Sequence, residues 1–137
     1  MRAREGTNNG AAVRCRSPAS AGATKLESVW ESSASNAALR ASGASRPEAS
    51  TYEGAATLEL KDGRWAFRGD HTTVAGTYAV EGDVIRLTMK TCTANPCSPG
   101  AVTQYSWSVY RDTLSLARRP GLPFWPRLVA TPAKRAQ

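Results

Sequence analysis

The stretch "LELKDGRWAFRG" (residues 58–69) contains two short runs in which apolar and polar residues alternate, joined at Asp62-Gly63. An Asp-Gly pair between two such runs is a strong short-range signal for a β-hairpin. The two leucines share one face of the first run, and Trp65 and Phe67 share one face of the second. The stretch therefore predicts two paired strands with one apolar face and one polar face exposed to solvent.

The same alternation of apolar and polar residues continues on both sides of this hairpin. The alternating runs are "AATLELK" (55–61), "RWAFR" (64–68), "GTYAV" (76–80), "VIRLTMK" (84–90), "VTQYSWSVY" (102–110), "TLSLA" (113–117) and "RLVAT" (127–131). They give seven strands, or eight if Val29-Trp30 belongs to another. Strands with one apolar face must roll up or pack on each other, and about eight of them close a small barrel. We predict an all-β fold, an antiparallel up-and-down meander of 7–8 strands that closes into a barrel. A β-sandwich is the alternative.

Two segments ahead of the hairpin carry other signals. "SNAALRASG" (35–43) predicts one short helix, with Ser35 or Asn36 as N-cap and Gly43 as its end. "ASRPEAS" (44–50) predicts a loop, because Pro47 disfavours helical geometry at the residue before it.

Domain organisation follows from where the alternation starts and stops. Residues 1–24 are rich in Ser, Ala, Gly and Asn and have no periodicity, which predicts a disordered tail or leader remnant. We predict one barrel domain over residues 25–132 and a basic C-terminal tail over residues 133–137.

The net charge of +7 lies towards the ends of the chain. Residues 1–25 carry +4, residues 117–137 carry +5, and the segment between them carries −2. A nucleic-acid module gathers its basic residues on one folded face, so this distribution argues against nucleic-acid binding. No window approaches the roughly 18 to 20 apolar residues of a membrane span.

Cysteine usage and the chain start give conflicting signals about the compartment. Cys92 and Cys97 flank a turn-rich loop, which suits a small disulfide in an oxidising compartment. The first 25 residues contain no apolar stretch of signal-peptide length, which points to the cytoplasm instead. A start codon further upstream would reconcile the two, and we therefore predict an extracellular or cell-envelope location. Cys15 is expected to be an unpaired thiol.

The order of four segments resembles a known family. "LELKDGRWAF", "GTYAVEGDVIRLT", "YSWSVYRDTLSLA" and "PFWPRLV" are similar to segments of the small lipocalin-like (calycin-type) domains of secreted bacterial proteins, over about residues 26–131. The resemblance implies a lipocalin-like barrel. It also implies a structural clasp in which an Arg of the last strand covers the Trp of the first, here Arg127 and Trp30. Such a contact is worth about 0.5 to 2 kcal/mol.

The aromatic residues of the strands are the candidate ligand-binding set. We expect a mostly apolar pocket to be lined by Trp65, Phe67, Tyr78, Met89, Tyr105 and Trp107. The alternative is that the same side chains fill a solid core. The leading hypothesis is a monomeric, non-enzymatic binding module for a small apolar molecule. The second is a structural or accessory module with a solid interior that binds a protein partner.

Metal, cofactor and catalytic signals are weak. The Cys92–Cys97 pair and the chain's single His are a poor zinc ligand set, because structural sites use four ligands. We predict no metal and no cofactor. Asp70-His71 is expected in a hairpin loop, where both residues are ordinary. A small barrel enzyme that uses His71 is therefore the third hypothesis.

Overall fold

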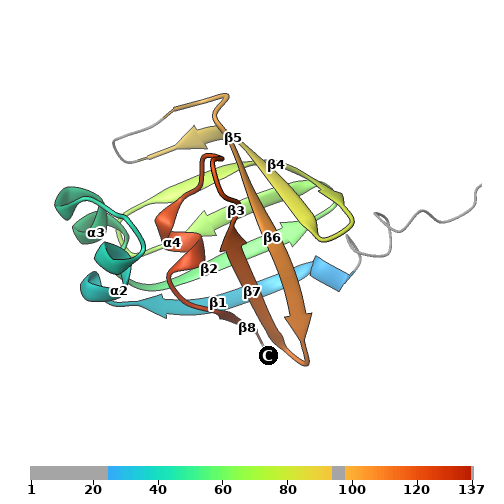
Figure 1. The fold of residues 1–137 in the computed structure, drawn as a ribbon, viewed down its shortest axis with the longest axis horizontal. Coiled ribbons are helices and arrows are strands. Elements are labelled where there is room, and N and C mark those ends of the chain that lie inside the picture. The colour runs from blue at the N-terminus through green and yellow to red at the C-terminus, as the bar shows by residue number, and fades with distance from the viewer. Residues whose placement is uncertain (1–24, 94–97, 137) are drawn as a thin grey trace, which may run out of the picture.

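The computed structural model describes residues 25–93 and 98–136. Eight antiparallel strands follow one another in chain order around a closed barrel, and β8 pairs with β1 to close it (Figure 1). The strands are β1 (Ser28–Ala34), β2 (Gly54–Lys61), β3 (Arg64–Arg68), β4 (Thr73–Glu81), β5 (Val84–Cys92), β6 (Val102–Tyr110), β7 (Thr113–Arg118) and β8 (Ala133–Arg135). The predicted all-β class and the closed meander are confirmed. The predicted tail over residues 1–24 lies outside the described residues.

The β2–β3 hairpin forms as the Asp-Gly pair predicts. Asp62 and Gly63 both have positive φ, 52° and 77°, which matches the right-handed twist of the flanking strands. The register places Leu60 opposite Trp65 and pairs the other leucine of β2 with the phenylalanine of β3. All four of these apolar side chains are buried.

A β-bulge between Ala75 and Gly76 shapes the neighbouring pair of strands, β4 and β5. Gly76 lies opposite Trp65, and the indole Nε1 donates a hydrogen bond to the carbonyl oxygen of Thr88 at 3.2 Å. A Cβ atom at Gly76 would overlap that carbonyl oxygen and lie 2.9 Å from the indole nitrogen. Only a residue without a side chain fits between the indole and β5.

Two helices connect β1 to β2 at one end of the barrel (Figure 1). The first, α2 (Asn36–Ala41), has Ser35 as its N-cap and confirms the predicted short helix. The second, α3 (Arg46–Tyr52), replaces the loop predicted over residues 44–50, and that prediction is wrong. Ser45 and Glu48 form a capping box, and Pro47 sits in the first turn, where a proline is tolerated.

The chain after β7 also differs from the prediction. Residues 127–131 were expected to form the last strand, but α4 (Pro126–Val129) is a helical turn whose first three residues are buried. The closing strand is β8, which pairs with both β1 and β7. The predicted basic tail over residues 133–137 is therefore wrong at its start, because Ala133–Arg135 belongs to the barrel.

The cation over the first-strand tryptophan comes from β8. Trp30 is fully buried and donates from Nε1 to the carbonyl oxygen of Leu26 at 2.9 Å. The guanidinium over its ring belongs to Arg135, 4.5 Å from the ring centroid. Arg127 lies in α4, over the ring of Phe67 at 5.4 Å. The predicted pairing of Trp30 with Arg127 is wrong, because the chain is helical at Arg127 and the last strand begins only at Ala133.

Candidate functional site

All six residues predicted to bind a ligand pack in or against the barrel core. Trp65, Phe67, Tyr78 and Tyr105 are buried, whereas Met89 and Trp107 are half-buried and contact the core. The alternation of the strands therefore located the inner face correctly. Whether that face encloses a ligand depends on the space left inside.

Three aromatic rings meet at the end of the barrel that carries α2 and α3. The ring of Trp125 lies edge-on to Phe67 at 4.7 Å and to Tyr52 at 4.9 Å, and Tyr52 lies edge-on to Phe67 at 6.3 Å. Tyr52 comes from α3 and Trp125 directly precedes α4. Strand alternation could not find these two residues, because both lie outside the strands. The capping box of α3 was the one local signal for Tyr52.

The polar atoms of the predicted set are largely engaged within the fold. The hydroxyl of Tyr105 accepts a hydrogen bond from the backbone N–H of Trp125 at 2.9 Å and donates to Thr103 Oγ1 at 3.0 Å. The indole Nε1 of Trp107 donates to the carbonyl oxygen of Gly82 at 3.0 Å. These groups join strands and loops to one another rather than standing free to orient a ligand.

A pocket of about 20 Å³ lies among the inward-facing side chains. It is lined by Ser32, Leu58, Phe67, Leu114, Leu116, Arg127, Leu128, Thr131 and Ala133. A single water molecule needs roughly 10–15 Å³, whereas pockets for drug-sized ligands measure roughly 300–1,000 Å³. This pocket therefore has room for a water molecule or a monatomic ion.

Arg127 is the charged group of this inner pocket, and it is only 1% exposed. Nε donates to the carbonyl oxygen of Tyr52 at 3.1 Å and Nη1 to Ser32 Oγ at 3.0 Å. Nη2 donates to the carbonyl oxygens of Ser32 at 3.3 Å and Gly54 at 3.1 Å. The guanidinium thus joins α4 to β1, β2 and the end of α3. Burial lowers the pKa of Arg127, since the charged form loses contact with water.

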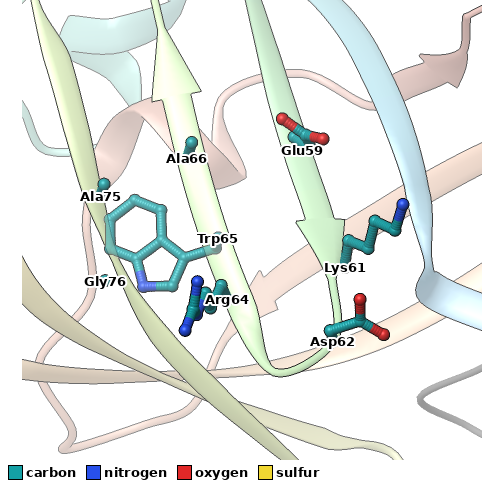
Figure 2. A pocket seen from close by; sticks show the side chains of 8 residues that line it. All are labelled: Glu59, Lys61, Asp62, Arg64, Trp65, Ala66, Ala75 and Gly76. Atoms are coloured by element: carbon teal, nitrogen blue, oxygen red, sulfur yellow. The ribbon is translucent and has the colours of Figure 1, made fainter.

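The outside of the barrel carries a larger hollow, of about 680 Å³, over β2, β3 and β4. Its lining residues are Glu59, Lys61, Asp62, Arg64, Trp65, Ala66, Ala75 and Gly76. Figure 2 shows the two alanines and the glycine on one side and Glu59, Lys61 and Asp62 on the other. The hollow exists because Ala66 lies directly opposite Ala75 on the outer face, so no large side chain fills that position. Two acids and two bases around it leave its formal charge balanced.

A second outer hollow, of about 650 Å³, lies over β1, β2 and the loop after β3. Its lining includes Glu31, Ser33, Thr57, Arg68, Asp70 and Lys134. The ion pair between Arg68 and Glu59, at 3.3 Å, joins the linings of the two hollows. This outer face is therefore polar and carries charges of both signs.

The remaining predicted sites are placed as follows. His71 and Asp70 are exposed, and within the part of the chain that the structure describes neither side chain makes a hydrogen bond or an ion pair. Cys97 lies outside the described residues, so its disulfide with Cys92 stays a prediction. Among residues 25–93 and 98–136, no three His, Cys, Asp or Glu residues are grouped to hold a metal ion. None of the helices described is long and apolar enough to span a membrane.

Comparison of the chain with protein-family models, with curated proteins and with solved structures finds no match. The resemblance to lipocalin-like domains therefore stays a prediction beyond the barrel itself.

The hydroxyl of Tyr105 makes the stability of the domain sensitive to alkaline pH. Burial raises the pKa of Tyr105 to about 12, against 10 for an ordinary tyrosine. Because the folded state holds the proton more tightly, its contribution is complete below pH 10 and is lost between pH 10 and 12. We expect the free energy of unfolding to fall by about 2 to 3 kcal/mol over that window from this group alone. Urea unfolding across this pH range measures it.

The variant Tyr105→Phe isolates this contribution from other tyrosines. Burial also raises the pKa of Tyr52 and Tyr78, so part of the alkaline slope should remain in the variant. A variant that loses stability with pH as steeply as the wild type would show that Tyr105 titrates normally.

Proposed function

We propose that this domain is a non-enzymatic interaction module with a solid barrel core, whose partner is a protein that binds to the outside of the barrel. The observation that carries the proposal is the volume of the inner pocket, about 20 Å³. That is smaller by more than tenfold than a typical small-molecule pocket. The ring contacts of Tyr52, Phe67 and Trp125 support the same conclusion, since a ligand at that end would have to displace them.

The rival proposal is that a small apolar molecule is held inside the barrel. It would need Trp125 and α4 to swing away from the end of the barrel. That movement breaks the hydrogen bond from the N–H of Trp125 to Tyr105 and the four hydrogen bonds of Arg127. Buried polar groups left without partners are costly, so the closed arrangement is favoured.

The outer hollows suit a polar partner surface. Both are lined mainly by charged and small residues. An acid of the first hollow, Glu59, and a base of the second, Arg68, form the ion pair between them. Alternating charges of this kind favour orientation and specificity in a protein complex over burial of apolar area. On the strength of the cysteine pair in its sequence, we also propose that the domain works outside the cytoplasm. As in the sequence analysis, we propose that it is a monomer.

Titration with lipophilic probes tests the solid core. A fatty acid, retinol and anilinonaphthalene sulfonate are added to the wild type while tryptophan emission is recorded. We expect no saturable change, because the inner pocket of about 20 Å³ is too small to accept these molecules. A saturable change with one-to-one stoichiometry would support the rival proposal instead.

The variant Leu116→Ala provides the matched control. Leu116 is half-buried and lines the inner pocket, so its truncation enlarges that pocket without touching the aromatic rings. We expect this variant to bind a small apolar probe such as benzene while the wild type does not. Equal responses from both would show that pocket volume does not control access.

A further inference from the structure

The buried guanidinium of Arg127 has no negative partner in the described structure. Across residues 25–93 and 98–136, no carboxylate forms an ion pair with it. Its four hydrogen bonds go to three carbonyl oxygens and one hydroxyl, all of them neutral. Buried charges in proteins are normally paired, so an uncompensated cation at 1% exposure calls for a counter-charge.

Hydrogen-bond donors without acceptors surround the same inner pocket. A guanidinium has five N–H groups, and four are used, which leaves one on Nη1. Ser32 Oγ accepts from Arg127, so its own proton is free to donate. Thr131 Oγ1 is buried without a partner among the described residues, and both hydroxyls belong to residues that line the pocket.

The size of the pocket restricts what can bind. Its volume of about 20 Å³ excludes phosphate, sulfate and organic carboxylates but accepts a single monatomic ion. Apart from Arg127, Ser32 and Thr131, the pocket is lined by four leucines, Phe67 and Ala133, and such an apolar surrounding strengthens the attraction between the guanidinium and an anion. A donor-lined, positively charged pocket of this size matches a halide.

We propose that the inner pocket beside Arg127, Ser32 and Thr131 is a binding site for a halide ion, chloride under natural conditions. The ion neutralises the guanidinium and accepts hydrogen bonds from Nη1 and the two hydroxyls. Because Ser32 lies in β1 and Thr131 follows α4, the ion joins the end of this helix to β1. This site is independent of the partner-binding function proposed above.

Thermal unfolding at constant ionic strength tests the site. Sodium gluconate is exchanged stepwise for sodium chloride or bromide, and the Tm of the full chain is recorded. We expect a saturable rise of roughly 3 to 6 °C, the shift given by a ligand at about ten times its Kd in a domain of this size. The same Tm in gluconate and in both halides would overturn the proposal.

Two threonine variants locate the effect. Thr131→Val removes one donor while keeping the shape of the side chain, and we expect the halide-dependent rise to shrink by half or more. Thr72→Val is the matched control, since Thr72 is 4% exposed, also has an unpartnered hydroxyl in the described structure, and does not line the pocket. It should keep the full rise. An undiminished rise in Thr131→Val would show that the ion binds elsewhere.

Anomalous scattering from crystals grown in bromide gives a readout that does not depend on either variant folding. A bromide peak within hydrogen-bond distance of Arg127 Nη1 is the expected result. Density for a water molecule, with no anomalous signal in the inner pocket, would overturn the proposal.

Discussion

Replacing Gly76 with alanine is expected to lower the free energy of unfolding by about 3 kcal/mol or more, or to prevent folding. The new Cβ would overlap the carbonyl oxygen of Thr88, a backbone atom that cannot move without distorting β5. It would also press on the indole nitrogen of Trp65 and break the hydrogen bond between these two groups. Urea unfolding followed by tryptophan fluorescence measures the loss.

The substitution Gly82→Ala separates this crowding from the general cost of replacing a glycine. Gly82 has a φ of 60° and no atom within 4 Å of its Cβ position. Alanine there should cost only about 1 to 2 kcal/mol, the penalty of left-handed backbone. If Gly76→Ala proved no more harmful than Gly82→Ala, the close approach of Trp65 to β5 would not exist in solution.

The barrel was predictable because its signals are local. Alternation assigns each residue of a strand to one face, and the Asp62-Gly63 pair fixes a hairpin and its register without knowledge of the rest. The alternation predicts the inner-face positions of four aromatic residues that the structure shows to be buried, Trp65, Phe67, Tyr78 and Tyr105. No long-range information was needed to place them on the inner face.

The helices show where competing local rules mislead. Ser45 and Glu48 have the spacing of a capping box, yet Pro47 between them suggested a break. A proline opposes a helix in its interior but not in its first turn, so the start of the helix had to be located first. The short apolar run of α4 fits a strand or a helix equally well, and only its packing against the barrel decides between them.

The volume of the interior could not be predicted from the strands. Tyr52 and Trp125 close one end of the barrel and come from outside the meander. The sequence left an open pocket and a filled core as alternatives, because both use the same inward-facing aromatics. The predicted pairing of Trp30 with Arg127 was wrong for a related reason. Arg135 lies in the last strand and Arg127 only eight residues before it, and the sequence did not show that α4 forms at Arg127 and delays the strand.

The substitution Arg127→Met is expected to lower the free energy of unfolding by about 3 to 5 kcal/mol. It removes four hydrogen bonds from a charged donor, worth roughly 1.5 to 3 kcal/mol each, and the removal of a buried charge offsets part of that loss. Methionine fills similar space but donates no hydrogen bond, so the carbonyl oxygens of Tyr52, Ser32 and Gly54 each lose the hydrogen bond from the guanidinium. Each lost hydrogen bond adds to the cost. If Arg127 only covered an aromatic ring, the loss would be about 0.5 to 2 kcal/mol. Urea unfolding distinguishes the two magnitudes.

Arg118→Met is the control for Arg127→Met, because Arg118 is exposed and its guanidinium lies over the ring of Phe124 at 4.8 Å. This variant should lose no more than about 1 kcal/mol, the value of an exposed cation–π contact. Arg127→Lys should lie close to Arg127→Met, since an ammonium group cannot reach carbonyl oxygens on three separate segments as the planar guanidinium does. A lysine variant as stable as the wild type would mean that charge alone matters at this position. The hydrogen-bond network that joins α4 to the barrel would then contribute little.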